Sequence, residues 1–166
     1  MDIQEFARIF PERIEKIKQF TQGNDIKDII GTEAVNHYKE SFQNEGFTDE
    51  TLNPWKDVKR RDPKSPWYGH SGQTGKFSAA RTTAKVLTGE TRELQNSITY
   101  ERIPGGARIK SDKPYAAVHQ FGGLAKIYGK KSFNMTPRPF IGKSAVMVRK
   151  INDKIKKEFA RLLKGV

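Results

Sequence analysis

The sequence predicts a mixed α+β protein with N-terminal helices, a small antiparallel sheet, a long C-terminal helix and a long mobile basic loop. Three observations predict this class. Apolar residues recur every three or four positions near both ends of the chain. Two short alternating segments near residue 100 are joined by a proline-glycine turn. The stretch from 46 to 85 is rich in proline, glycine and basic residues and poor in aliphatic ones.

Composition limits the possibilities further. With 166 residues, 35% hydrophobic and 30% charged, we expect one domain over 1–166 with a modest core, in which 46–85 is extended or mobile. The chain has no cysteine, which excludes disulfides and thiolate metal sites. No apolar run approaches the ~20 residues of a membrane span, and the acidic start lacks the pattern of a signal peptide. We therefore expect a protein made and used in a cytoplasm, without membrane contact.

The net charge of +12 is unevenly distributed. Residues 1–55 hold 6 basic and 11 acidic side chains, whereas every later part of the chain is net positive. Two interpretations remain open. The basic parts face a polyanion such as DNA, or acidic and basic surfaces of neighbouring copies meet head to tail.

The first two elements are expected to be helices. Apolar residues from Ile3 to Ile17 form one stripe, interrupted by Pro11, which predicts either a kinked helix or two short ones. A second helix is expected from Ile26 to Gln43, with Asp25 as its N-cap. His37 lies beside its apolar stripe and is interpreted as a partly buried structural histidine.

The basic loop interleaves Trp55, Trp67 and Tyr68 with cations, a pattern suited to phosphate neutralisation and base stacking. An equally weighted alternative is a solvated arm whose Trp55 anchors on the core. Gly69 to Lys76 resembles a phosphate-binding loop but lacks its spacing, its hydroxyl and a preceding strand, so we exclude nucleotide binding. The candidate DNA-facing residues are Lys56, Lys59, Arg60, Arg61 and Lys64.

An antiparallel hairpin is expected next. Leu94 to Ile103 alternates as a half-buried strand, Ile103-Pro104-Gly105-Gly106 has the residues of a type II turn, and Ala107 to Lys110 returns as the partner. Residues 124–135 are expected to add one or two edge strands. The last element is a helix whose apolar stripe runs from Val148 to Leu162 and whose other faces are basic.

Two short motifs stand between these elements. After Pro114, Tyr115 to Phe121 is long enough for about two helical turns, which Gly122-Gly123 ends because glycine accepts left-handed geometry. Tyr115, Val118 and His119 should share one side of this helix. Pro137-Arg138-Pro139 should be stiff and extended, so that Arg138 projects and Phe140 is aimed as an anchor.

These motifs carry a resemblance. The run Tyr-Ala-x-x-His-Gln-Phe-Gly-Gly followed by Pro-Arg-Pro-Phe-x-Gly resembles the tailed-phage virion morphogenesis family, which includes tail completion and head-tail joining proteins. Phe42-x-x-Glu45-Gly46-Phe47, Trp55, and Leu87-Thr88-Gly89 leading to Ser97-Ile98 agree with it in order. The assembly and structural motif is Tyr115, His119, Gln120, Phe121, Gly122, Gly123, Pro137, Arg138, Pro139 and Phe140.

The resemblance implies a structural virion protein that forms a closed ring, a hexamer, at the phage neck or the head-proximal end of the tail. Its expected partners are itself, other neck, connector or tail proteins, and DNA met without sequence specificity in the lumen. Truncating Phe121 or enlarging Gly122 should abolish folding or assembly, whereas neutralising Lys59, Arg60 and Arg61 should leave the fold intact.

Two other classes of function remain as alternatives. The first is a sequence-independent DNA-binding accessory protein that uses 56–85 and the C-terminal helix. The second is an enzyme, which we disfavour because His37, His70 and His119 lack metal-ligand spacing and no nucleophile motif is present. His119 with Glu90 or Asp112 could form a base and carboxylate pair. We expect no catalysis, metal or cofactor.

Overall fold

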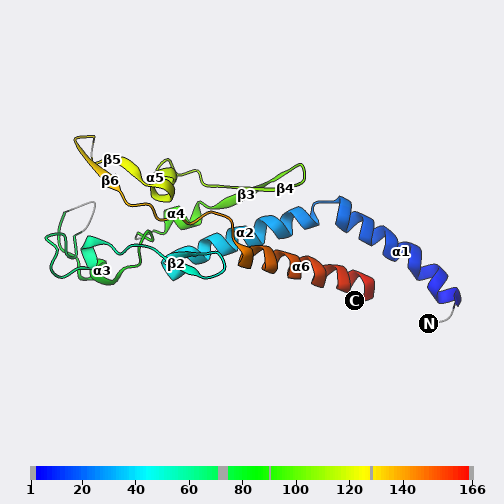
Figure 1. Cartoon of the computed structure of the whole chain (residues 1–166). Helices are drawn as coiled ribbons and strands as arrows, with labels where there is room; N and C mark the ends of the chain where they lie inside the picture. Colours follow the sequence, from blue (N-terminus) through cyan, green and yellow to red (C-terminus); the bar gives the residue numbers. More distant parts are fainter. Residues whose placement is uncertain (1–2, 71–74, 90, 128, 165–166) are drawn as a thin grey trace. The chain divides into compact units, whose positions relative to one another are not determined.

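A computed structural model describes residues 3–70, 75–89, 91–127 and 129–164 (Figure 1). The mixed α+β class is confirmed, but the strands pair as three separate two-stranded antiparallel sheets, β1-β2, β3-β4 and β5-β6. The helices are α1 (Ile3–Gln22), α2 (Asp25–Asn44), α3 (Ala79–Thr83), α4 (Glu93–Asn96), α5 (Ala116–Phe121) and α6 (Ala145–Lys164), and η1 (Lys59–Arg61) is a 3-10 turn. The strands are β1 (Gly46–Thr48), β2 (Leu52–Pro54), β3 (Thr99–Ile103), β4 (Gly106–Lys110), β5 (Gly123–Ile127) and β6 (Lys131–Met135).

The chain divides into two compact units. Unit 1 contains the described residues up to His37, Thr99–Lys110 and the described residues from Ser144 onward. Unit 2 contains Tyr38–Ile98 and Ser111–Lys143. The expectation of a single domain over 1–166 stays a prediction.

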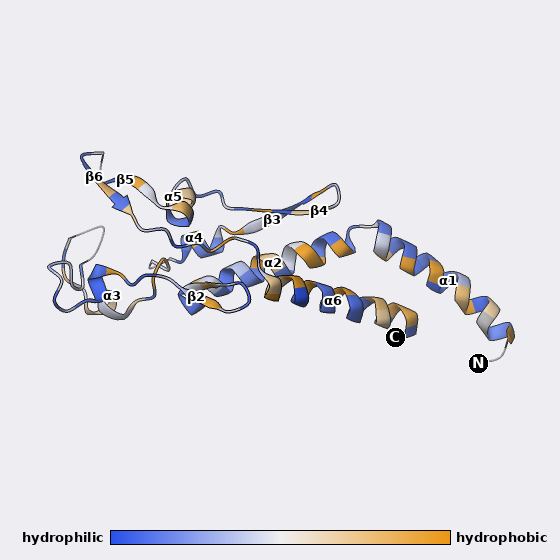
Figure 2. Cartoon of the chain, viewed as in Figure 1, coloured by the Kyte–Doolittle hydropathy of each residue, from blue (hydrophilic) through white to orange (hydrophobic). Residues whose placement is uncertain are grey.

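Unit 1 is built from amphipathic helices with a small core. α1 runs through Pro11 as one continuous helix, so the alternative of two short helices is wrong. The apolar and polar residues of α1 and α6 alternate in Figure 2 as the sequence pattern requires. Phe20 and Ala34 are the buried apolar side chains of the described part of this unit, and no described residue of α6 is buried.

The β3-β4 hairpin of unit 1 has the predicted turn. Ile103 pairs with Gly106, and Gly105 has φ +79°, which a type II turn requires at its third position. The hairpin is fixed to α2 by Asp28, whose carboxylate accepts two 2.7 Å bonds from Arg102 and one of 3.1 Å from the Tyr100 hydroxyl. Gly31 lies directly against the Tyr100 ring, where a Cβ would overlap it, so this glycine serves a close approach.

Unit 2 has an aromatic core. Phe42, Ile98 and Phe140 are almost fully buried. The Phe42 ring lies 5.3 Å from Phe140 and 5.6 Å from Trp55, centroid to centroid. The Trp55 indole also donates a 2.7 Å hydrogen bond to the Pro139 carbonyl. Trp55 therefore anchors on the core, as expected if the basic loop is a solvated arm held by this tryptophan.

The segment 46–85 has more regular structure than the sequence predicts. It contains the β1-β2 hairpin, η1 and α3, and His70 forms an isolated bridge with Phe77. These elements are held by side chains such as Arg60 rather than by an aliphatic stripe, so periodicity does not reveal them. Part of the segment resembling a phosphate-binding loop lies outside the described residues, and the mobility of 46–85 stays a prediction.

The expected strand from Leu94 to Ile103 is wrong in its first half. Residues Glu93–Asn96 form the short helix α4, and the strand begins at Thr99. Leu94 and Ile98 are both buried and lie four positions apart, a spacing that suits one side of a helical turn. The Ser97 hydroxyl bonds the Leu94 carbonyl at 2.7 Å, which stabilises that turn. Gly123–Ile127 and Lys131–Met135 form the two strands expected over 124–135, but these strands pair with each other as a separate sheet and do not extend the edge of β3-β4.

Candidate functional site

The centre of the motif region is the side chain of Gln120. Its amide nitrogen donates a 2.6 Å hydrogen bond to the Ile141 carbonyl, and its amide oxygen accepts bonds from the backbone nitrogens of Phe140 at 2.9 Å and Ile141 at 3.1 Å. One side chain thus satisfies three backbone groups of a segment about twenty positions away. We call this arrangement the glutamine bracket. It fixes α5 to the proline-rich segment.

The predicted end of α5 is confirmed. Gly122 follows Phe121 with φ +73°, and a Cβ there would lie 2.8 Å from the Met135 carbonyl oxygen and 2.9 Å from Pro137 Cδ. The backbone nitrogen of Arg138 donates a 2.7 Å bond to the His119 carbonyl. The two motif segments therefore touch backbone to backbone, which only a residue without a side chain permits at position 122.

Arg138 does not project, which corrects the expectation from the sequence. Its exposed fraction is 7%, and its guanidinium donates bonds of 3.0 and 3.2 Å to the Lys56 carbonyl. Burial lowers the pKa of Arg138. The double-proline segment aims this side chain inward, while Phe140 is buried as the predicted anchor. Arg138 thereby ties the start of the basic loop to the motif.

A cleft of about 680 Å³ lies beside the bracket in unit 2. The motif pieces Leu87-Thr88-Gly89, Tyr115, His119 and Arg138 all contribute to its lining. The Tyr115 and His119 rings meet edge to face at 5.9 Å, so they share one side of α5 as expected. Burial and the charge of Arg138 lower the pKa of His119. Both effects favour the neutral imidazole.

Arg60 and Arg61 are used inside unit 2. The Arg60 guanidinium donates hydrogen bonds to the carbonyls of Arg81, of Ala84 at 2.6 Å and of Lys85 at 3.1 Å. Arg61 bonds the Glu45 carboxylate at 2.5 and 3.2 Å and the Ala84 carbonyl at 2.8 Å. These two cations hold the loop against the end of α2, a role that the sequence analysis missed. Lys56, Lys59 and Lys64 are exposed, and their DNA-facing role stays a prediction.

Glu45 makes this contact sensitive to acid. Burial raises its pKa, but hydrogen bonds from Arg61 and the Val86 N–H and the charges of Arg61 and Lys85 outweigh that effect and hold the pKa below its usual value. Because the pKa of Glu45 is lower in the folded state, its ionised carboxylate stabilises the fold at a pH above the unfolded-state pKa near 4.5. This stabilisation is lost as the pH falls through the folded-state pKa.

We therefore expect the unfolding free energy to fall as the pH drops below about 4.5, with a shallower slope in Glu45→Gln. Urea unfolding followed by circular dichroism between pH 3 and 7 measures this slope. Equal slopes in the variant and the parent would contradict the role given to Glu45.

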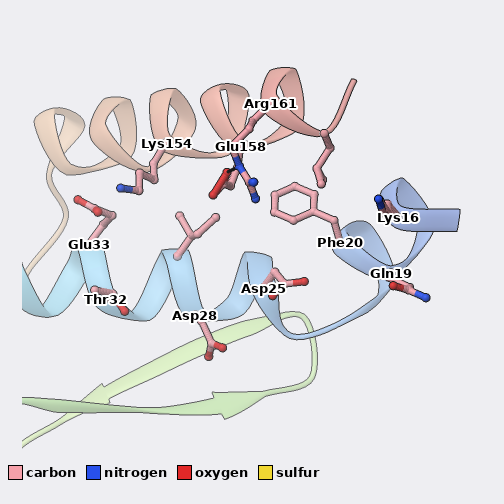
Figure 3. A pocket seen from close by; sticks show the side chains of 12 residues that line it. Lys16, Gln19, Phe20, Asp25, Asp28, Thr32, Glu33, Lys154, Glu158 and Arg161 are labelled. Carbon is pink, nitrogen blue, oxygen red and sulfur yellow. Dashed lines mark hydrogen bonds and ion pairs between the residues drawn. The ribbon is translucent and has the colours of Figure 1, made fainter. Parts of the chain in front are cut away.

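Unit 1 has a cleft of about 490 Å³ lined by α2, α6 and the end of α1 (Figure 3). Its charged lining residues are the acidic Asp25, Asp28, Glu33 and Glu158 and the basic Lys16, Lys154 and Arg161. The Asp28 carboxylate points away from the cleft to the β3-β4 hairpin (Figure 3). Glu158 and Arg161 form a 2.7 Å ion pair on one side of it. The cleft is therefore of mixed charge, and it contains none of the predicted motif residues.

The described residues contain neither a metal-binding cluster nor a membrane-spanning helix. No group of three or more histidine, cysteine, aspartate or glutamate side chains in this part of the chain could hold a metal ion. None of the helices described here is long and apolar enough to span a membrane.

Comparison with known families decides the membership of the chain. A sequence model of the phage virion morphogenesis family matches residues 21–160, which is most of the chain. The chain belongs to this family. The matched range includes the glutamine bracket and the 680 Å³ cleft, whereas nearly all of α1 precedes it. We call this cleft the basic cleft because its lining includes Arg60, Arg81, Lys85 and Arg138. No curated protein and no solved structure matches the chain.

Within this phage virion morphogenesis chain, the two phenylalanines of the motif differ in burial, since Phe140 is 1% exposed and Phe121 is not buried. Phe121 is 78% exposed, and Leu124, which follows the two glycines, is 68% exposed. Gln120, Gly122, Arg138 and Phe140 by contrast are all engaged within unit 2. The motif thus combines a rigid interior with an apolar exterior at the end of α5.

Proposed function

We propose that the chain is a structural virion subunit that forms a ring, a hexamer, in tail completion or head-tail joining. It assembles in the host bacterial cytoplasm, remains in the virion and catalyses no reaction. Its partners are further copies of itself and other neck, connector or tail proteins, with DNA passing through the lumen without base readout. Membership in the phage virion morphogenesis family supports the broad role.

The observation that carries the ring proposal is the exposed apolar pair on the rigid motif. Burying a phenylalanine side chain that is otherwise exposed contributes about 1.5–3 kcal/mol. Phe121 gains little of this within its own unit, because it is 78% exposed. The glutamine bracket and Gly122 nevertheless hold its helix in place. A fixed, exposed aromatic side chain of this kind suits a subunit contact.

Phe121→Ala is expected to abolish assembly and to change the unfolding free energy by less than about 0.5 kcal/mol. Sedimentation velocity and negative-stain microscopy of concentrated protein measure the assembly, with annular particles expected from the parent. Phe77→Ala is the matched control, because Phe77 is also an exposed phenylalanine, at 66%, but lies outside the motif. Annular particles from Phe121→Ala equal to those of the parent would contradict the proposal, as would a parent that never assembles.

A DNA-binding accessory protein is the second candidate. It is favoured by the exposed cations of α6, which include Lys150, Lys154, Lys156 and Lys157, and by the exposed lysines 56, 59 and 64. A binder that makes several phosphate contacts loses affinity by orders of magnitude between ~50 and ~200 mM salt. Fluorescence anisotropy with labelled duplex and single strands distinguishes the candidates, since a ring subunit binds weakly at every salt concentration.

A further inference from the structure

The basic cleft of unit 2 is lined by more cations than carboxylates among the described residues. Its charged lining residues are Arg60, Arg81, Lys85, Arg138 and a single described carboxylate, Glu93. Glu45 and Asp57 act on these arginines from outside the lining, and both carboxylates accept hydrogen bonds from Arg61. Burial lowers the pKa of Arg60, and the charges of Arg81 and Arg61 lower it further. These guanidinium groups repel one another.

Two buried nitrogens of the cleft lining have no hydrogen-bond partner among the described residues. They are Nε of Arg81 and Nδ1 of His119. A buried donor left without a partner costs about 1–3 kcal/mol, and more when it is charged. The guanidinium groups of Arg60 and Arg138 do have partners, since they donate hydrogen bonds to backbone carbonyls. Arg81 differs from them because no described residue accepts a hydrogen bond from its Nε.

We propose that this cleft binds an oxyanion, of the phosphate or carboxylate class, with Arg81 as its main ligand and His119 as a second donor. A neutral imidazole donates from one ring nitrogen, so an oxyanion at Nδ1 selects the tautomer that carries its proton there. Arginine presents several N–H donors in a planar fork that matches such oxygens. A water molecule in the same place would accept the hydrogen bonds but leave the repulsion between Arg60 and Arg81 unrelieved.

The size of the cleft indicates what kind of molecule carries the oxyanion. A volume of about 680 Å³ exceeds that of a single phosphate ion, so the group belongs to a larger molecule or is accompanied by water. Leu87-Thr88-Gly89, Tyr115 and His119 line the same space, so the oxyanion would sit against residues of the family motif. The proposal does not depend on ring formation, because every residue it uses lies in unit 2 of one chain.

The primary test measures phosphate binding to the full chain and to Arg81→Gln. Inorganic phosphate is expected to raise the melting temperature of the parent at constant ionic strength, with chloride as the reference salt. Arg81→Gln should bind phosphate at least about tenfold more weakly, since hydrogen bonds to charged groups are the stronger ones. Without phosphate, its melting temperature should equal or exceed that of the parent, because a repulsive charge is gone. Lys59→Gln is the matched control, since it removes one exposed cation outside the cleft and should retain binding.

A second measurement distinguishes binding in the cleft from a general salt effect. The charged and titratable groups that line the cleft with His119 are Arg60, Arg81, Lys85, Arg138, Glu93 and Tyr115. An oxyanion among them should raise the pKa of His119 in the parent, as seen by NMR of the imidazole, and leave it unchanged in Arg81→Gln. Repeating the titration with acetate and with a short oligonucleotide shows whether a carboxylate, a free phosphate or a nucleic-acid phosphate is preferred. Equal phosphate effects on the parent and Arg81→Gln, or an unmoved His119, would overturn the proposal.

Discussion

Replacing Gly122 by valine is expected to destabilise the protein by about 3–5 kcal/mol, because a left-handed backbone and a steric overlap are combined at one position. Gly122 has φ +73°, and the new Cβ would lie 2.8 Å from the Met135 carbonyl oxygen and 2.9 Å from Pro137 Cδ. Neither neighbour can move freely, since Pro137 precedes a buried arginine. Urea unfolding followed by circular dichroism measures the loss.

Gly105→Val is the matched control for this substitution. Gly105 has a similar φ of +79°, but nothing lies within 4 Å of the Cβ position. The control should therefore cost only the backbone strain, about 1–2 kcal/mol. Equal losses in the two variants would show that the contact between Gly122 and the proline-rich segment has no energetic role.

Gln120→Leu is expected to cost about 3–4 kcal/mol, since it leaves three backbone groups without their partner. The groups are the nitrogens of Phe140 and Ile141 and the carbonyl of Ile141. Leucine has nearly the same size, so packing is retained and the loss reports the hydrogen bonds. The near-ultraviolet signal of Trp55, which bonds the adjacent Pro139 carbonyl, should weaken with it.

Gln22→Leu makes the same chemical change at an exposed position at the end of α1. Its effect should stay within about 0.5 kcal/mol. If Gln120→Leu proved as mild as this control, the bracket would not hold α5 to the proline-rich segment.

The long helices and the β3-β4 turn were predictable because their signals are local. The stripe from Val148 to Leu162 repeats every three or four residues, and the Pro104-Gly105 pair fixes a turn type by itself. The glycine end of α5 was predictable for the same reason. α4 was missed because Leu94 and Ile98 fit a helical turn as well as a strand, and a helix of four residues carries little periodicity.

The roles of the arginines could not be predicted from the sequence. Arg60 and Arg61 lie among exposed lysines, and only the folded chain brings Glu45 and the carbonyls of 81–85 to them. The expectation that neutralising Lys59, Arg60 and Arg61 leaves the fold intact therefore no longer follows from the contacts. The exposure of Phe121 was not predictable either. An aromatic residue in a helical motif is usually buried, whereas this one is exposed.

The glutamine bracket has a consequence for engineering the chain. The contacts of 119–122 with 137–141 close the β5-β6 hairpin at its base, so the tip near Gly129 and Lys130 is tethered at both sides. The entropy of closing a loop grows only with the logarithm of its length, about 0.6 kcal/mol for each doubling. A short peptide tag inserted at this tip should therefore be displayed at little thermodynamic expense.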